Sequence, residues 1–485
     1  MSNSIKRLAG ETVIYGVSTI LGRLLNWLLI PVLYVRTNTM EEIGALGEIL
    51  AFCAILLVLF TYGLETGFFR FSKDGNENNV YKTSITMLTF TSLLLIILTF
   101  CFAPALNNFL GNGKHLISIY LACIIIALDA FLSIPFAKLR LQNKAFKFAT
   151  IKLINICIII LFNFLFLLII PKFINENLLP ENIVTLYNNF DKIFYIFLSN
   201  LIATSSMFLF FISDLRNIKG KFESQIAKKM LIYTWPVLLV GLTGMIIQNS
   251  DRLLMSKLVD SDGLMKTGLY TVNFKIGVLM SLYAQSFRLA FEPFFFKNQD
   301  NGKDSYAKAM EYFIFFGMFL FLGITLFLDV INLMITNNYV EGNIIIPYVM
   351  FGFLFFGIYY NLSLWYKLTD NTIWAFYFGL TGMIITIALN IILVPRIGIL
   401  GGALSLMAGY FVMMIMSYFK GQKIYPVPYN IKKIGIFVFS GILFYIINQR
   451  ITFDIMIFRY VFKVTILILY IYIFVKIEGL KINKR

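Results

Sequence analysis

Long apolar runs recur along the whole chain, and they restrict its fold more than any other feature of the sequence. A helix of ~20 apolar residues, rising 1.5 Å per residue, spans the ~30 Å hydrocarbon core of a bilayer. Of the 485 residues, 59% are apolar and only 14% are charged, whereas soluble domains carry about 25% charged residues. The sequence lacks the alternating pattern of a membrane β-barrel, so each span must satisfy its backbone within a helix. These features predict an all-α polytopic membrane protein.

Segments rich in charge, Asn and Gly divide the apolar runs into about 14 predicted transmembrane helices. The predicted spans are residues 12–35, 43–66, 83–106, 116–136, 151–171, 193–213, 230–251, 268–291, 309–331, 343–364, 372–394, 400–419, 433–449 and 455–476. No connection is long enough to fold as an extramembrane domain, and the longest covers about 172–192. Lys6 and Arg7 precede the first run, but no small-residue cleavage site follows it, so we expect the first span to remain.

The chain has a net charge of +16, and its basic residues are unevenly distributed between the two predicted sides of the membrane. Lys and Arg outside the spans favour the side of the N-terminus by roughly three to one, as expected of cytoplasmic loops. This bias accounts for the basic composition without a nucleic-acid partner, and it predicts that both termini are cytoplasmic.

Cysteine and histidine offer little material for redox or metal chemistry. The four cysteines all fall within predicted spans and form no CxxC pair, so we expect neither a disulfide framework nor a metal site. His115, the single histidine, lies in a short loop where the sequence indicates no acidic neighbour. We therefore expect no cofactor and no histidine-based catalysis.

An internal repeat relates the two halves of the chain. Five short matches occur in order at an offset of roughly 226 residues. They pair Arg23 with Arg252, Gly44 with Gly268, Asp74 with Asp300, Arg140 with Lys367, and Pro171 with Pro395. The offset covers six helices, an even number, so both copies cross the membrane in the same sense. The repeat predicts two pseudo-symmetric six-helix bundles, at 1–220 and 221–425, followed by two additional helices within 426–485.

Three segments resemble one transporter superfamily. They are NSDRLLMSKLVDSDGLMKTGLYTVNFKIGVLMSLYAQSFRLAFEPFFFK from Asn249, ALNIILVPRIGILGGALSLMAGYF from Ala388, and LRLQNKAFKFATIKL from Leu139. The first resembles the region of helices seven and eight in polysaccharide and lipid-linked oligosaccharide flippases. The second is similar to the region between helices 11 and 12, and the third to the loop before helix five. These flippases belong to the multidrug/oligosaccharidyl-lipid/polysaccharide exporter superfamily.

The resemblance implies a transporter that works by alternating access around a central cavity. Its expected substrate is an oligosaccharide linked to undecaprenyl diphosphate, carried across the bacterial plasma membrane for O-antigen, capsule or exopolysaccharide synthesis. The family implies coupling to an ion such as H⁺ or Na⁺, or to the membrane potential. Its expected partners are membrane lipids and polysaccharide assembly proteins.

Basic residues within or near the spans are the candidate substrate-binding groups. Arg23 lies about 24 Å of helix beyond Arg7, which is too far for snorkelling to the cytoplasmic side. An arginine at this depth is costly against lipid, so it should face either a cavity or a buried acid. Its planar guanidinium suits a diphosphate, although a structural ion pair is the alternative. Lys275 is a second candidate that a snorkelling side chain would also explain, and Arg252 is a third whose charge Asp251 could neutralise.

Acidic and paired residues are candidates for ion coupling or gating. Asp129 lies roughly 13 Å inside the predicted fourth span, where a carboxylate can titrate, bind Na⁺, or pair with an arginine. Glu65 and Arg70 lie near the inner end of the predicted second span. They could form an interfacial ion pair or be part of a gate. Two further cations, Arg459 and Lys463, lie near the outer end of the last span and are expected to snorkel.

Three other functions compete with the polysaccharide flippase. A lipid II flippase would share the fourteen helices. In that family the first helix reads approximately Ser-Arg-x-x-Gly-x-x-Arg, whereas this chain keeps only one arginine in the matching stretch from Gly22 to Trp27. A multidrug–cation antiporter would need an acidic cavity, whereas the buried excess here is basic. A membrane glycan polymerase or ligase would need a catalytic cluster, usually on a large outer loop, and we expect no enzyme.

Overall fold

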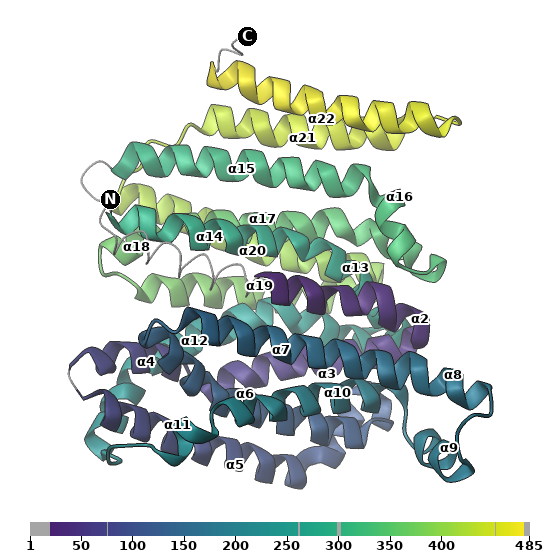
Figure 1. Cartoon of the computed structure of the whole chain (residues 1–485). Coiled ribbons are helices and arrows are strands. Elements are labelled where there is room, and N and C mark those ends of the chain that lie inside the picture. Colours follow the sequence, from purple (N-terminus) through teal and green to yellow (C-terminus); the bar gives the residue numbers. More distant parts are fainter. Residues whose placement is uncertain (1–19, 75, 260–261, 298–301, 452, 480–485) are drawn as a thin grey trace. The chain divides into compact units, whose positions relative to one another are not determined.

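The computed structural model describes residues 20–74, 76–259, 262–297, 302–451 and 453–479, nearly all of them in helices (Figure 1). Among these described residues, 13 helices are long and apolar enough to cross a membrane. This confirms the predicted all-α polytopic class. Lys6, Arg7 and both chain ends lie outside the described residues, and the sidedness of the membrane stays a prediction.

The chain forms two compact units, Met1–Thr271 and Val272–Arg485. After the first helical span, Ile20–Thr37, the first unit contains α3 (Met40–Thr61), α4 (Leu64–Phe71), α5 (Glu77–Phe109), α6 (Leu116–Leu141), α7 (Ala145–Phe164), α8 (Ile170–Asn175), α9 (Glu181–Asn188), α10 (Lys192–Met207), α11 (Ile212–Arg216) and α12 (Ser224–Leu258). The second unit contains α14 (Leu279–Lys297), α15 (Gly302–Leu326), α16 (Leu328–Ile331), α17 (Ile346–Leu362), α18 (Leu364–Leu368), α19 (Ile373–Ile397), α20 (Ile399–Ile424), α21 (Ile431–Arg450) and α22 (Met456–Glu478). Helix α13 (Gly263–Gly277) crosses the division.

The predicted eighth span, 268–291, is the one that differs most from the structure. It is divided between α13 and α14 by a turn at Val278. The two pieces carry Lys275 and Arg288, and neither is among the helices that meet the length and hydropathy of a span. The compact units divide at Thr271, whereas the predicted boundaries after 220 and 425 describe sequence repeats and stay a prediction.

Local sequence signals explain where α3 begins and ends. Thr39 caps its N-terminus, because the Thr39 hydroxyl accepts from the Glu42 N–H at 3.2 Å and the Glu42 carboxylate accepts from the Thr39 N–H at 2.7 Å. At the other end Tyr62 and Gly63 both have positive φ, 34° and 69°. Such backbone favours glycine and ends a right-handed helix. The predicted second span is therefore two helices, α3 and α4.

Two glycines of the repeat meet inside the first unit. A Cβ added to Gly44 on α3 would lie 2.0 Å from the Leu264 carbonyl oxygen of α13. A Cβ added to Gly268 on α13 would lie 2.0 Å from the Met40 carbonyl oxygen of α3. Gly268 and Leu264 are the repeat mates of Gly44 and Met40 at one common offset. Reciprocal contact between equivalent residues is what a local twofold axis produces, so the packing supports the predicted repeat.

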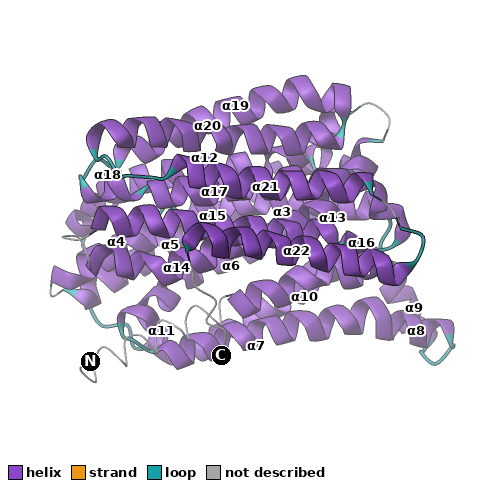
Figure 2. Cartoon of the chain, turned by 90° about the horizontal axis from the view of Figure 1, so that it is seen from above, coloured by secondary structure: helices purple, strands orange, loops and turns teal. Residues whose placement is uncertain are grey.

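The two C-terminal helices pack against α15 of the second unit, as Figures 1 and 2 both show. The Phe315 ring, midway along α15, stacks on Phe474 in the last turns of α22 with centroids 3.9 Å apart. The Lys433 ammonium of α21 lies 2.7 Å from the Glu311 carboxylate and also pairs with Glu478. Aromatic stacking and ion pairs therefore fix α21 and α22 to this unit.

Candidate functional site

A cluster of charged side chains lies within the first unit and draws on four helical segments. At its centre is Lys152, in the second turn of α7, whose ammonium interacts electrostatically with Asp129, Arg140, Glu65 and Arg23. Asp129 and Arg140 lie on α6, Glu65 lies on α4, and Arg23 lies on the first helix. Three cations thus face two carboxylates, which leaves the cluster with a net positive charge.

The first helix reaches this cluster because Gly22 lets it approach α7 closely. A Cβ added to Gly22 would lie 2.5 Å from Cδ1 of Ile156, one helical turn beyond Lys152. The neighbouring Arg23 side chain is exposed on the surface of the chain. Arg23 is therefore not enclosed within the first unit, and it lies within electrostatic range of a second cation, Lys152; its cavity role stays a prediction.

Asp129 faces the same cluster from α6. Its carboxylate accepts a hydrogen bond from the Thr204 hydroxyl of α10 and feels the charge of Lys152. The Lys152 ammonium also lies 4.1 Å from the centroid of the Phe136 ring, a favourable cation–π position. Asp129 is half-buried, so it combines a specific hydrogen bond with an adjacent cation and partial access.

An ion pair between α4 and α6 completes the cluster. The Glu65 carboxylate lies 2.5 Å from the Arg140 guanidinium, a partner that the sequence did not indicate. Arg140 is also over the Phe69 ring, 5.4 Å from its centroid. Arg70 lies in the last turn of α4 and is exposed. The predicted gating residues therefore lie at opposite ends of α4, Glu65 in its first turn and Arg70 in its last, and Glu65 is tied to α6.

Arg252 occupies a very different setting on α12. Its side chain is 7% exposed, and its guanidinium lies 3.4 Å from Asp251 and 2.5 Å from the Gln248 carbonyl oxygen. It also donates to the Asn249 amide oxygen at 3.2 Å, while the Tyr270 hydroxyl donates to Asp251. The structure thus contains the neutralising pair that the sequence allowed. The candidate Lys275 belongs to the second unit, where it is half-buried on α13.

Glu48 is a buried acid that sequence analysis missed. It is fully buried on α3, where its carboxylate accepts from the Gly111 N–H at 2.8 Å and from the Ser256 hydroxyl. The Lys257 ammonium lies 3.6 Å away. This arrangement joins α3, the turn between α5 and α6, and the end of α12. Its partners are remote in the sequence, so only the depth of Glu48 inside a span could have indicated it.

The expectation that His115 has no acidic neighbour is wrong. Its Nδ1 lies 2.5 Å from Asp191 Oδ2, and Asp191 also caps α10 by accepting from the Phe194 N–H at 2.7 Å. Asp191 is remote in sequence, which is why the short loop around His115 did not reveal it. The pair connects the starts of α6 and α10, and it serves a structural role there. Within the described residues no group of three His, Cys, Asp or Glu side chains could hold a metal ion.

Comparison with known proteins places the fold in a class of transporters. The chain is similar to a solved structure of the lipid II flippase MurJ in an inward closed conformation, with a TM-score of 0.76 and 18% identity over 96% of this chain and 99% of that chain. It is also similar to an inward-facing multidrug resistance MATE family transporter of the MOP superfamily, with a TM-score of 0.63 and 12% identity over 87% of this chain and 98% of that chain. The protein thus has the fold of these two membrane transporters, the MOP superfamily fold.

A relative among curated proteins narrows the context. The capsular polysaccharide biosynthesis protein CapF of Staphylococcus aureus is 24% identical over 421 residues, covering 84% of this chain and 98% of CapF. No family model matches the chain. The resemblance to the exporter superfamily is confirmed at the level of the fold, together with a distant relation to a capsule biosynthesis protein. The protein is accordingly a multi-pass membrane protein with the MOP fold.

Proposed function

We propose that this protein carries an oligosaccharide linked to undecaprenyl diphosphate across the bacterial plasma membrane during surface polysaccharide synthesis. The observation that carries the proposal is the charged cluster in the first unit, in which Arg23 and Arg140 act electrostatically on Lys152. A diphosphate is a compact anion with several acceptor oxygens, and an arginine fork beside an ammonium matches it. The capsule biosynthesis relative supports a glycan as the cargo.

In this mechanism the substrate's diphosphate relieves a repulsion that exists in its absence. Arg23 and Lys152 carry like charges that interact with each other, so an anion between them stabilises the site. The glycan and the polyprenyl chain need no deep charged pocket. Alternating access then exposes the cluster to one side of the membrane at a time, as in other two-bundle transporters.

Asp129 is the residue we propose for coupling to H⁺ or Na⁺. Its carboxylate interacts with the Lys152 ammonium and accepts from Thr204. A proton or a sodium ion on Asp129 would weaken its hold on Lys152 and leave that cation for the diphosphate. Glu65 and Arg140, paired at 2.5 Å, are the proposed gate, which must open to admit an anion to Arg140.

Lipid II is the second candidate substrate, favoured by the similarity to MurJ over nearly the whole chain. It also bears an undecaprenyl diphosphate, so the same cluster would bind it. The basic cluster argues against a cationic drug, because Arg23 and Lys152 would repel it. The two glycolipid candidates differ in the glycan, and a test must therefore identify the glycan.

The test is to delete the gene in the native cell and measure lipid-linked oligosaccharides in each leaflet. Complementation uses the wild type, Arg23→Ala, Lys152→Ala and the control Lys114→Ala, an exposed lysine on the turn between α5 and α6. We expect the deletion to trap the intermediate in the inner leaflet, with rescue by wild type and Lys114→Ala only. All variants must reach the membrane at equal levels.

Three results would contradict the proposal or part of it. Unchanged surface glycan and intermediate pools, in a strain without a second flippase, would remove the polysaccharide function. Accumulation of lipid II with normal surface glycan would assign the same fold and cluster to lipid II transport. Full rescue by both Arg23→Ala and Lys152→Ala would leave the flippase function intact but show that the charged cluster does not bind the substrate.

A further inference from the structure

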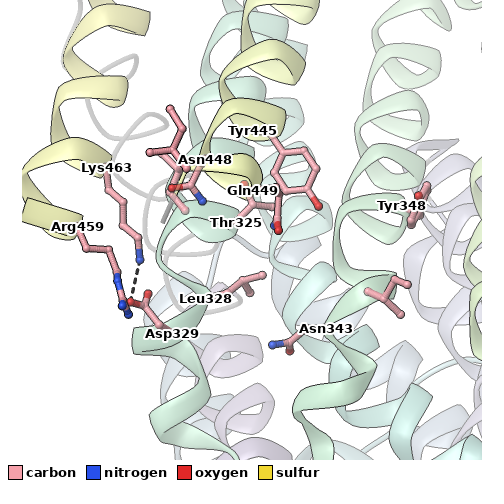
Figure 3. Close-up of a pocket in the computed structure, with 13 residues that line it drawn as sticks. Thr325, Leu328, Asp329, Asn343, Tyr348, Tyr445, Asn448, Gln449, Arg459 and Lys463 are labelled. Atoms are coloured by element: carbon pink, nitrogen blue, oxygen red, sulfur yellow. Dashed lines mark hydrogen bonds and ion pairs between the residues drawn. The ribbon is translucent and has the colours of Figure 1, made fainter. Parts of the chain in front are cut away.

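A polar cavity lies within the second unit, at the end of its helices where α15 and α21 finish and α22 begins. Its volume is about 610 Å³, within the ~300–1,000 Å³ of typical ligand pockets. The cavity is formed by α15, α16, the 3₁₀ helix Asn337–Ile345, α17, α21 and α22. Figure 3 shows its polar side chains, among them Asp329, Asn343, Asn448, Gln449, Arg459 and Lys463. Such a concentration of polar groups is unusual in so apolar a chain.

The charges around this cavity leave one positive charge in excess. The Lys463 ammonium lies 2.8 Å from the Asp329 carboxylate (Figure 3), and its side chain is 7% exposed. Lys463 therefore does not snorkel, contrary to expectation. Partial burial raises the pKa of Asp329, but the ion pair with Lys463 outweighs this and holds the pKa below its ordinary value. Asp329 stays ionised and balances Lys463, so Arg459 supplies the excess charge.

Arg459 is the accessible cation of the cavity. It is exposed on α22, one turn before Lys463, and one of its terminal nitrogens donates to the Phe453 carbonyl oxygen at 3.0 Å. A guanidinium has five N–H donors, so this bond leaves donors for an anionic oxygen. A single accessible arginine favours a ligand with one negative charge.

The cavity also offers a hydrogen-bond acceptor that the protein does not use. Asn343 lines the cavity, and its Oδ1 is buried and accepts no hydrogen bond, although its amide donates to Asn332 at 3.1 Å. A buried acceptor without a donor is costly. Rotation of the Asn343 amide would let a ligand hydroxyl donate to this atom, so the ligand is one that carries hydroxyls as well as a phosphate-like anion.

The position of the cavity indicates that the ligand is a lipid. The cavity lies where three membrane-spanning helices end or begin, at Leu326, Arg450 and Met456. Beside it, the first turn of α22 exposes the large apolar side chains Ile457 and Phe458. A ligand with its polar part in the cavity would place its apolar part along this exposed surface, at the depth of the lipid headgroups.

We propose that this cavity binds the headgroup of an anionic bilayer phospholipid that carries hydroxyls, as phosphatidylglycerol does. Arg459 contacts the phosphate, and Asn343 accepts from a hydroxyl. The acyl chains lie against the start of α22. This site is independent of the charged cluster in the first unit. The proposal is therefore the same whichever glycolipid the protein transports.

Native mass spectrometry of the purified full-length protein tests the site. Dissociation constants are compared for phosphatidylglycerol and for phosphatidylcholine with the same acyl chains. We expect phosphatidylglycerol to bind about tenfold more tightly, and Arg459→Gln to remove most of that difference. Asn448→Leu, which alters the cavity without changing its charge, should weaken the binding of phosphatidylglycerol several-fold. The control Lys432→Gln removes one exposed positive charge at the opposite end of α21 and should change neither constant.

Four outcomes would overturn the proposal. Equal binding of the two phospholipids by wild type would mean nonspecific lipid contact. An equal loss in Lys432→Gln and Arg459→Gln would mean a general charge effect. Competition by soluble glycerol 3-phosphate at the affinity of the lipid would identify a site for free phosphate esters. Displacement by undecaprenyl diphosphate, lost in Arg459→Gln, would assign the cavity to the transported lipid instead of a bilayer phospholipid.

Discussion

Arg23 and Arg252 occupy equivalent positions of the internal repeat, yet their surroundings differ in burial, partners and charge. Arg23 is exposed and lies near the Lys152 cation. Arg252 is 7% exposed and is held by Asp251. The residue before each arginine differs in the same way, because a glycine precedes the first and an aspartate precedes the second.

This difference shows how one repeated position can serve two purposes. Asp251 is fully buried and neutralises its neighbour, so the second copy stabilises the packing of α12 and α13. Gly22 has no side chain, so the first copy can approach α7 and bring Arg23 to the charged cluster. We therefore expect mutations in the second copy to change stability and mutations in the first copy to change transport.

Asp251→Ala should have the largest effect of any change at these positions. It leaves the buried Arg252 without its anion, and removing one partner of a buried pair costs about 3–5 kcal/mol. Denaturant unfolding of the purified protein in detergent measures the loss. Asp251→Asn keeps an acceptor for Tyr270 and should lose less. If Asp251→Ala unfolds like wild type, Arg252 has another counter-ion and the structural role of this pair is wrong.

Arg23→Gln should reduce transport by about ten- to a hundredfold, because it removes a charge-assisted hydrogen bond to the proposed diphosphate. Stability should change by less than ~0.5 kcal/mol, since the side chain is exposed. Arg23→Lys keeps the charge but loses the planar guanidinium fork, so its transport rate should lie between those of the wild type and Arg23→Gln. Flipping of a fluorescent polyprenyl-diphosphate glycan in proteoliposomes is the measurement, with Lys114→Gln as the control. A stability loss that matches the transport loss would mean that Arg23 is structural.

Gly22→Asp gives the first copy the neighbour that the second copy has. The new carboxylate should neutralise Arg23 and lower transport by about tenfold, which corresponds to ~1.4 kcal/mol. The added Cβ meets only Cδ1 of Ile156, the far end of a flexible side chain, so the fold should persist. Gly22→Ala controls for the added volume in the same proteoliposome assay. Equal losses in Gly22→Ala and Gly22→Asp would show that helix approach, and not charge, distinguishes the two copies.

The sequence was sufficient to predict the fold because its signals are local or periodic. Apolar length predicted all the spans except 268–291, and the repeat paired Gly44 with Gly268, whose reciprocal contact only the structure shows. The break at Tyr62 and Gly63 was missed, because a turn inside the membrane leaves the hydropathy of the run unchanged. A conformation with positive φ depends on packing that hydropathy does not describe.

The candidate site was only partly predictable. Arg23, Asp129 and Glu65 were found from their depth within predicted spans, and the structure brings all three around Lys152. Lys152 was not among the candidates, because it stands at the edge of the predicted span 151–171 beside other basic residues. Glu48 depends on Ser256 and Lys257, which lie in another copy of the repeat. Partners this remote are set by tertiary packing, and a single sequence does not specify them.

Glu65→Gln should have little effect on stability, and it sharpens the comparison of the two copies by testing the ion pair between Glu65 and Arg140. Glu65 and Arg140 are 39% and 33% exposed, and partly exposed pairs are worth less than ~1 kcal/mol. Denaturant unfolding should therefore change little, in contrast to Asp251→Ala. Transport should rise or fall several-fold if the pair is a gate, because its loss leaves Arg140 with an uncompensated charge beside Arg23 and Lys152. If Glu65→Gln transports at the wild-type rate, the ion pair is not a gate. The proposed functional residues of the first copy are then Arg23, Lys152 and Asp129.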